Sequence, residues 1–317
     1  MSSEIAVQTQ GLTKRFGRQV AVNDLDLEIE TGEVFGLIGP NGAGKTTLIR
    51  MLATAEQPTL GDISIQGQRL QRNHTNAELK RLIGYLPDDF PLYEDLTVWE
   101  YLNYFARLYQ LGQPRRRQRL FDVLELVQLT HKRHSAVATL SRGMKQRLGL
   151  ARTIIHEPIL LLLDEPVSGL DPIARVQFRE LITVLREAGM TIVISSHILS
   201  DLAELCTSIA IMELGYLVEH TSLTQLYQHL SQQQLLISTL GDVAVLEEAL
   251  RGCPHIEHWQ VDPNQQQVLA HFNGDQGAAA ELLRSLMAAD IPLYNFQCIQ
   301  EDLETIYLNK LDHKQVS

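Results

Sequence analysis

A glycine-rich loop lies between a short apolar run and a helix-forming run near the start of this chain. The apolar run, Val34 to Ile38, suits a buried strand, and Leu48 to Leu52 suits a helix. The loop follows the pattern G-x-x-x-x-G-K-[ST], whose backbone N–H groups wrap around phosphate groups. Because both flanks fit the pattern, we interpret the loop as a phosphate site rather than an incidental turn. Its residues are Gly39, Pro40, Asn41, Gly42, Ala43, Gly44, Lys45, Thr46 and Thr47.

Two further strand-like runs end in polar side chains. Ile159 to Leu163 is apolar throughout, as expected of a parallel strand covered on both faces, and Asp164 and Glu165 follow it. Thr191 to Ile194 is β-branched throughout and leads to His197. In an open α/β sheet the ligand lies beyond the carboxyl ends of the strands. We therefore expect these side chains to converge on the phosphate loop.

Charge and reach suggest a role for each side chain. We predict that Lys45 binds the β- and γ-phosphates of a nucleotide, and that Thr46 and Asp164 hold Mg²⁺. Glu165 lies one residue beyond the strand and is expected to orient and deprotonate the attacking water. A neutral His197 is expected to hydrogen-bond the γ-phosphate. An isolated Asp-Glu pair or a lone His would more often cap a helix, but the strand context favours catalysis.

A second helix start offers another wall for an anion. Ser141 and Gly143 open a run, Met144 to Ile155, that has the pattern of a helix. The N-terminus of a helix presents unpaired N–H groups and positive partial charge. Many Ser-x-Gly segments only cap helices. We interpret this one as a possible anion site because the phosphate loop upstream would need such a second wall.

The order and spacing of these motifs resemble those of ATP-binding cassette (ABC) ATPases. The resemblance extends over about two-thirds of the chain and includes Ser168 to Pro172. It implies that two subunits pack head to tail, so that each ATP lies between one phosphate loop and the Ser141 and Gly143 helix of the other subunit. It also implies that Asp171 couples the two sites. Phe16 lies where the family places a ring against adenine, with an ordinary core position as the alternative.

One position departs from the family pattern. The family usually has Gln where the strand Leu82 to Pro87 leads into a helical subdomain, and this chain has Asp88 followed by Asp89. An Asp side chain is shorter than that of Gln and adds charge, so Asp88 is expected to bind Mg²⁺ through an intervening water or not at all. A solvated acidic turn is an equal alternative.

Composition narrows the class of protein. The chain has 317 residues, of which 44% are hydrophobic, enough for one large core and a smaller one. A net charge of -11 argues against a nucleic-acid partner. The cysteines Cys206, Cys253 and Cys298 form no C-x-x-C pair and are expected to be reduced thiols in the cytoplasm. No run reaches the roughly 18–20 apolar residues of a membrane span, so any pore is expected in another polypeptide.

We predict an α/β fold with two domains. An ABC-type P-loop NTPase domain is expected over residues 1–220, with a helical subdomain inserted at about 88–157. A linker at 221–231 and an accessory domain at 232–317 follow. The accessory domain alternates strands and helices in the order βαββαβ, which suggests a small ferredoxin-like α+β module, with a last helix over Leu303 to Leu311. A regulatory or dimer-stabilising role for it is a hypothesis.

The resemblance also implies partners. It implies an ATPase subunit that energises separate transmembrane permease subunits from the cytoplasmic face of the membrane, paired with a second copy of itself. The segment from Ser141 to Gln146, which we call the signature segment, has Met144 and Lys145 at its fourth and fifth positions. A single cassette with this form of the segment and an added C-terminal module is similar to ABC-2-type exporters, whose cargoes include drugs, lipids, polysaccharides and ions. A soluble regulatory ATPase that acts on a protein partner is the alternative. Tyr93 and Trp99 are candidate docking residues, although packing within the subdomain explains most aromatic residues there.

Overall fold

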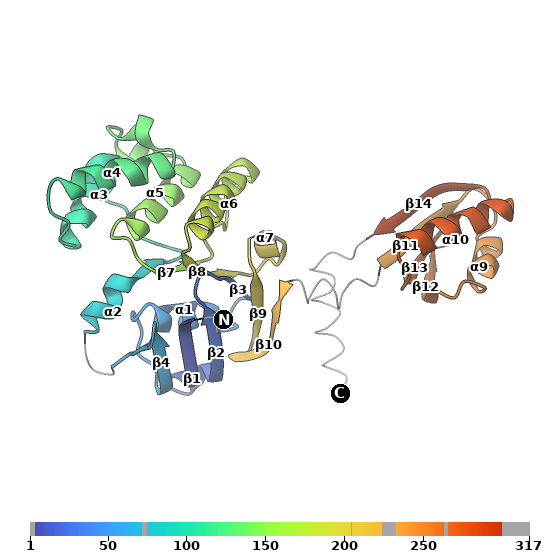
Figure 1. Cartoon of the computed structure of the whole chain (residues 1–317), viewed down its shortest axis with the longest axis horizontal. Coiled ribbons are helices and arrows are strands. Elements are labelled where there is room, and N and C mark those ends of the chain that lie inside the picture. Colours follow the sequence, from blue (N-terminus) through green and yellow to red (C-terminus); the bar gives the residue numbers. More distant parts are fainter. Residues whose placement is uncertain (1–3, 72–74, 204, 224–232, 263–265, 300–317) are drawn as a thin grey trace. The chain divides into compact units, whose positions relative to one another are not determined.

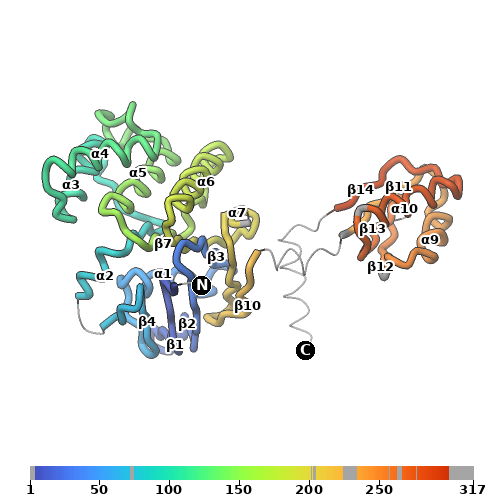
Figure 2. The backbone as a smooth tube through the Cα atoms, in the orientation of Figure 1, coloured from blue at the N-terminus to red at the C-terminus, as the bar shows by residue number. Residues whose placement is uncertain are grey.

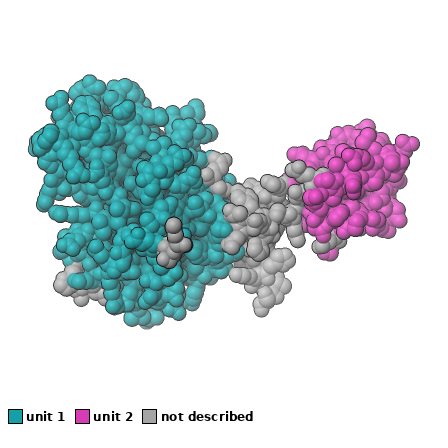
Figure 3. Space-filling model, in the orientation of Figure 1, with its two compact units in different colours: residues 1–223 teal, residues 224–317 magenta. Residues whose placement is uncertain are grey.

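The structure is a computed structural model that describes residues 4–71, 75–203, 205–223, 233–262 and 266–299. The chain divides into two compact units, residues 1–223 and residues 224–317, drawn in teal and magenta in Figure 3. None of the helices in the described part of the chain has both the length and the hydropathy of a membrane span.

A six-stranded sheet forms the centre of the larger unit (Figure 1). Its order is β10 (Tyr216–Ser222), β9 (Ser208–Glu213), β3 (Val34–Ile38), β8 (Thr191–Ser196), β7 (Leu160–Asp164) and β6 (Ile83–Leu86). Five strands are parallel, and β10 is an antiparallel edge strand. Every residue of β3, β7 and β8 is buried, which explains why these strands are apolar on both faces.

A second, antiparallel sheet shares a hydrophobic core with the first. It contains β2 (Gln19–Glu30), β1 (Ile5–Phe16), β4 (Leu60–Ile65) and β5 (Gln68–Arg69), in that order. In β2, the buried residues Leu25, Leu27 and Ile29 alternate with exposed polar ones, as expected of a sheet with one face on a core. The same core includes buried residues of β3, β7 and α1 (Lys45–Leu52). Our sequence analysis did not predict this sheet.

Helices interrupt the parallel sheet between β6 and β7, and Figure 2 follows the chain out through them and back. α2 (Ala77–Leu82) precedes β6, and then come α3 (Val98–Leu108), α4 (Arg115–Leu126), the 3₁₀ turns Thr130–Lys132 and Val137–Thr139, and α5 (Arg142–Ile154). A capping box between Thr97 and Glu100 starts α3. The fully buried Tyr101, Leu124 and Leu148 place one residue each from α3, α4 and α5 in the packed interior.

Two more helices follow strands of the parallel sheet. α6 (Pro172–Glu187) follows β7, and α7 (Ser200–Ala203) follows β8. α6 starts where Asp171 caps it, because the Asp171 carboxylate accepts a hydrogen bond from the Ala174 N–H at 2.9 Å. β10 extends to Ser222, so the linker predicted at 221–231 was wrong in its first two residues, which are strand.

The smaller unit has the ferredoxin-like order predicted for it. It contains β11 (Gln233–Thr239), α9 (Val243–Leu250), β12 (Ile256–Asp262), β13 (Gln267–Phe272), α10 (Gln276–Ala288) and β14 (Leu293–Ile299). The strands form an antiparallel sheet in the order β12-β13-β11-β14. Apolar residues of both helices and of the sheet form a core of its own. The helix predicted over Leu303 to Leu311 lies outside the described residues.

Candidate active site

The phosphate loop joins the carboxyl end of β3 to the first turn of α1. Backbone crowding explains its glycines: a Cβ at Gly39 would overlap the Met212 carbonyl oxygen, and a Cβ at Gly44 would overlap that of Ala21. Gly44 also has a φ of 107°, which side chains rarely allow. The loop therefore directs the N-terminus of α1, with its unpaired N–H groups, at the edge of the sheet where the strands end.

Lys45 is buried against the loop that precedes it. Only 5% of the residue is exposed, and its ammonium group donates to the carbonyl oxygens of Gly39 at 2.6 Å and Pro40 at 3.3 Å. Its Nζ atom also lies 3.5 Å from Oε1 of Glu165. These partners satisfy a buried cation at the position where the sequence predicts contact with phosphate oxygens.

Asp164 ends β7 beside the start of α1. One of its carboxylate oxygens accepts hydrogen bonds from the hydroxyl groups of Ser195, at 2.6 Å, and Thr46, at 3.2 Å. Burial raises the pKa of Asp164, and the two hydroxyl donors oppose that shift. A hydroxyl and a carboxylate are the hard oxygen ligands that suit Mg²⁺, so the residues present fit that ion.

Ser195 is a site residue that our sequence analysis missed. It pairs with Asp164 across the parallel ladder of β7 and β8, and its hydroxyl oxygen also accepts from the Glu165 N–H at 3.0 Å. The backbone of Glu165 has a φ of 48°, an uncommon value for a residue with a side chain. Ser195 thus holds both acidic residues at the turn. Its position at a strand end opposite Asp164 was the available signal.

Glu165 and His197 contact each other. Nδ1 of His197 lies 2.8 Å from Oε2 of Glu165, and the Glu165 side chain is only 13% exposed. A carboxylate accepts hydrogen bonds, so Nδ1 carries the proton in this contact. In a neutral ring, Nε2 is then an acceptor and cannot donate to a phosphate. Donation to a phosphate therefore requires either the cationic ring or release of Glu165.

Asp88 lies on the same edge of the sheet, two residues beyond the end of β6. Its side chain is exposed, yet partial burial and the carboxylates of Asp164 and Glu165 raise its pKa. The structure therefore places Asp88 within electrostatic range of the two acidic residues. Among the described residues, none donates a hydrogen bond to the Asp88 carboxylate.

Phe16 shares a pocket with the phosphate loop. The pocket has a volume of about 200 Å³ and is lined on one side by Phe16, Gln19 and Ala21. Phe16 is 48% exposed, and the ammonium group of Lys14 lies 4.8 Å from the centre of its ring. Phe16 is therefore not a core residue. The other lining residues are Gly42, Gly44, Lys45, Thr46 and Thr47.

The signature segment lies at the N-terminus of α5, beside α6. Ser141 is exposed and caps α5 by accepting from the Met144 N–H at 3.3 Å. Gly143 is buried, and a Cβ there would come within 2.7 Å of the Ala174 Cβ. The first turns of α5 and α6, which Ser141 and Asp171 cap, therefore lie against each other. None of Ser141, Gly143 and Asp171 is among the described residues that line the pocket with Phe16.

The fold and this edge of the sheet define a class of protein. A phosphate loop between a parallel strand and a helix, with acidic residues at the end of a second strand, is the arrangement of a P-loop nucleotide-binding domain.

Comparison with known proteins places the chain within this class. The profile of the ABC transporter family matches residues 22–168. The linearmycin resistance ATP-binding protein LnrL of Bacillus subtilis (strain 168) is 30% identical over 306 residues, 96% of this chain and 97% of LnrL. The bacitracin transport ATP-binding protein BcrA of Bacillus licheniformis is 41% identical over 214 residues, 67% of this chain and 68% of BcrA.

A solved structure of the ATP-binding subunit of an ABC transporter agrees with this placement. It is 31% identical, with a TM-score of 0.63, and the match covers 71% of this chain and 92% of that chain. The chain belongs to the family of ABC transporter ATP-binding proteins, and it is an ATPase.

Proposed function

We propose that this chain hydrolyses ATP as the head-to-tail dimeric subunit of an ABC-2-type exporter and energises separate permease subunits. The observation that carries the catalytic part is the position of Glu165. Its two carboxylate oxygens face Lys45, at 3.5 Å, and His197, at 2.8 Å, one residue beyond the Asp164 that contacts Thr46. The cation of Lys45, the proposed base Glu165, and the oxygen ligands of Thr46 and Asp164 thus lie at one edge of the sheet.

ATP would bind with its phosphates on the loop from Gly39 to Thr47. Lys45 exchanges the carbonyl oxygens of Gly39 and Pro40 for the β- and γ-phosphate oxygens, which are stronger partners for an ammonium group. Thr46 and Asp164 would hold Mg²⁺, and Asp88 would assist them. The ion supplies positive charge that stabilises the developing charge on the phosphate oxygens. Phe16 would stack on the adenine ring.

Glu165 acts as the general base. Its carboxylate accepts a proton from the attacking water while the water oxygen forms a bond to the γ-phosphorus. The bond from that phosphorus to the β–γ bridging oxygen breaks, and ADP leaves with the electron pair. His197 orients Glu165 through Nδ1 and reaches the γ-phosphate when it carries a second proton or turns away from Glu165.

The exposure of Ser141 and Asp171 supports the dimer. Neither they nor Gly143 are among the described residues that line the pocket with Phe16. Ser141 and Gly143 would therefore close the site of a second copy, where the N-terminus of α5 offers N–H groups to its γ-phosphate. Asp171, at the N-terminus of α6, would couple the two sites.

The names of two relatives support export, since one refers to linearmycin resistance and the other to bacitracin transport. The subunit would work at the cytoplasmic face of the membrane through its permease. The test is to co-express the chain with the product of an adjacent gene that encodes about six apolar spans, each about 20 residues long. A membrane complex whose ATPase activity responds to candidate cargo supports the proposal. ATPase activity that responds only to a soluble protein partner would favour the regulatory alternative.

A further inference from the structure

Arg142 connects the first turn of α5 to the segment that follows β7. Its guanidinium group donates a hydrogen bond to the carbonyl oxygen of Ser168 at 3.0 Å. The group also lies against Gly169, because a Cβ added there would be 2.5 Å from three of the guanidinium atoms. Gly169 has a φ of 63°, so its backbone conformation also disfavours a side chain. Arg142 therefore packs on this segment as well as bonding to it.

Ser168 links Arg142 to the proposed general base. The N–H of Ser168 donates to the carbonyl oxygen of Glu165 at 3.1 Å, while the carbonyl oxygen of Ser168 accepts from Arg142. The same segment continues to Asp171, whose carboxylate caps α6. A single residue thus joins the first residue of α5 to the backbone of Glu165.

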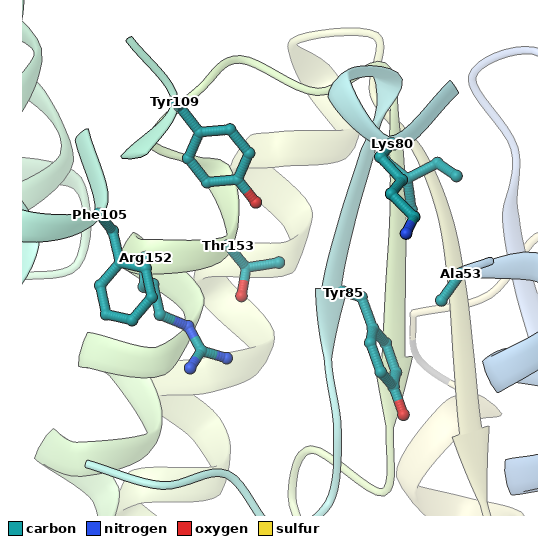
Figure 4. A pocket seen from close by; sticks show the side chains of 8 residues that line it. Ala53, Lys80, Tyr85, Phe105, Tyr109, Arg152 and Thr153 are labelled. Atoms are coloured by element: carbon teal, nitrogen blue, oxygen red, sulfur yellow. The ribbon is translucent and has the colours of Figure 1, made fainter. Parts of the chain in front are cut away.

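The other two arginines of α5 make their contacts within the helical subdomain. Arg147 is buried and donates to the carbonyl oxygen of Val127 at 3.2 Å. The guanidinium group of Arg152 lies 5.3 Å from the centre of the Phe105 ring, and Figure 4 shows these two side chains on one wall of a pocket. Arg142 instead reaches out of the subdomain. It therefore offers a direct route by which a shift of α5 reaches the segment after β7.

The charge of Arg142 also acts on the acidic edge of the site. Burial raises the pKa of Asp88, and so do the carboxylates of Asp164 and Glu165, whereas the guanidinium group of Arg142 lowers it. Arg142 therefore lies within electrostatic range of Asp88 and offsets part of the negative charge gathered there. The cation that contacts Ser168 is thus also part of the electrostatic environment of the site.

We propose that Arg142 is a positioning residue that couples the two nucleotide sites of the dimer. The inference rests on the proposed function, in which Ser141 faces the ATP bound by the partner subunit. That ATP would fix the first turn of α5, and Arg142 would then hold Ser168 and the backbone of Glu165 in place. Binding of ATP at one site would thereby order the base at the other. Arg142 would act within each subunit, in addition to Asp171.

Turnover measured against ATP concentration with the purified full chain tests the inference. Arg142→Ala should lower maximal turnover by about tenfold, as expected when a hydrogen bond from a charged group is lost. The Hill coefficient, which two coupled sites allow to reach about 2, should fall towards about 1. The affinity for ATP should be unchanged, because Arg142 does not line the pocket with Phe16. Arg142 is exposed, so the melting temperature should change little.

Further variants separate positioning from general damage. Arg142→Lys keeps a charged donor and should recover part of the turnover and of the cooperativity. Gly169→Ala places a Cβ where the guanidinium group lies, so it should lower turnover in the wild type but have a smaller effect in Arg142→Ala, where that space is free.

Two controls match these variants. Gly67→Ala introduces a side chain at a φ of 70° with open space around its Cβ, and so controls for backbone strain. Arg117→Ala removes an exposed charge from α4. Both should hydrolyse ATP like the wild type.

Wild-type turnover and cooperativity in Arg142→Ala would overturn the inference while the proposed function stands. Reduced turnover with an unchanged Hill coefficient would also overturn it, because Arg142 would then serve only its own subunit. So would a lack of cooperativity in the wild type when Glu165→Gln still forms the ATP-bound dimer. If the wild type shows no cooperativity and Glu165→Gln forms no such dimer, the proposed dimer fails and the inference fails with it.

Discussion

Nδ1 of His197 lies 2.8 Å from Oε2 of Glu165, so the expected base and the expected phosphate ligand are partners of each other. The contact assigns the proton to Nδ1 and orients the carboxylate, whose other oxygen faces Lys45. In the proposed mechanism, donation from His197 to the γ-phosphate therefore requires either the cationic ring or a rearrangement of this pair. Glu165 would accept a proton from water, and Lys45 would exchange its present partners for phosphate oxygens.

Removal of the base should separate binding from hydrolysis. Glu165→Gln keeps the shape of the side chain but cannot accept a proton from water, so turnover should fall by about 10²–10⁴-fold. ATP binding should be retained, and the ATP-bound dimer should accumulate on size-exclusion chromatography. Glu180→Gln, an exposed change on α6, is the matched control and should hydrolyse ATP like the wild type. Wild-type turnover in Glu165→Gln would refute the assignment of the base.

The contact between Glu165 and His197 predicts coupled effects. Two residues that act as a unit lose less together than the sum of their separate losses. We expect His197→Ala to lower turnover in the wild-type background but to have little further effect in Glu165→Gln. Steady-state turnover of the two single variants and the double variant measures this coupling. Strictly additive losses would show that the residues act independently.

We expect Asp164 to support ATP hydrolysis while its ionised carboxylate lowers the free energy of unfolding. Its pKa is raised by burial, so the folded state holds the Asp164 proton more tightly than the unfolded state does. The ionised carboxylate therefore destabilises the fold above the raised pKa, and lowering the pH through that pKa relieves the cost. Asp164→Asn still accepts hydrogen bonds through its amide oxygen, and should melt at a higher temperature than the wild type at neutral pH.

Melting temperatures measured across a range of pH distinguish this electrostatic cause from a change in packing. The gap in melting temperature between Asp164→Asn and the wild type should narrow as the pH falls and Asp164 becomes protonated. A gap that stays constant from neutral to acidic pH would contradict the electrostatic explanation. The variant should also lose Mg²⁺-dependent ATPase activity, since an amide is a weaker ligand than a carboxylate.

Asp88 should affect the requirement for Mg²⁺. Partial burial and the nearby carboxylates of Asp164 and Glu165 raise the pKa of Asp88. Three acidic side chains therefore lie within electrostatic range of one another where the ion is expected. We expect Asp88→Ala to raise the Mg²⁺ concentration that gives half-maximal ATPase activity. Asp89→Ala changes the adjacent exposed carboxylate and should leave that concentration unchanged. An unaltered Mg²⁺ dependence in Asp88→Ala would remove Asp88 from the metal site.

Phe16 should contribute to nucleotide affinity. Stacking of an aromatic side chain on a base contributes about 1–3 kcal/mol, so Phe16→Ala should weaken ATP binding by about 5- to 150-fold. Phe16→Tyr keeps the ring and should bind nearly as well as the wild type. Val20→Ala, a change at an exposed residue of β2 that does not line the pocket, is the control. Equilibrium titration with a fluorescent ATP analogue measures all three.

Three central strands, β3, β7 and β8, were predictable because they are buried on both faces. Complete burial demands an uninterrupted apolar run, as in Leu160 to Leu163, and such a run is visible in a single sequence. The antiparallel sheet has one solvated face, and register shifts interrupt the pairing of β1 with β2, so its alternation is weak. That sheet became clear only in three dimensions.

The site was predictable in its residue types more than in its contacts. The motifs place Lys45, Asp164 and Glu165 on one edge, but the role of Ser195 depends on its pairing opposite Asp164. The difference between Tyr93 and Trp99 depends on tertiary packing: Tyr93, in the loop before α3, lies beside Tyr104 and Phe105, whereas Trp99, in the first turn of α3, packs on Phe121 of α4. Composition cannot distinguish these two environments, since both rings occur in the same aromatic-rich segment.

The length of α5 has a mechanical consequence. Its 13 residues form one uninterrupted helix, which at about 1.5 Å per residue is a rod about 20 Å long. The end that carries the Ser141 cap faces the neighbouring subunit's nucleotide in the proposed dimer, and the other end carries Arg152. Closure of the dimer around ATP would push directly on the first end of this rod. The displacement would then reach the Arg152 end of α5 as a rigid-body shift, without any unfolding of the helix.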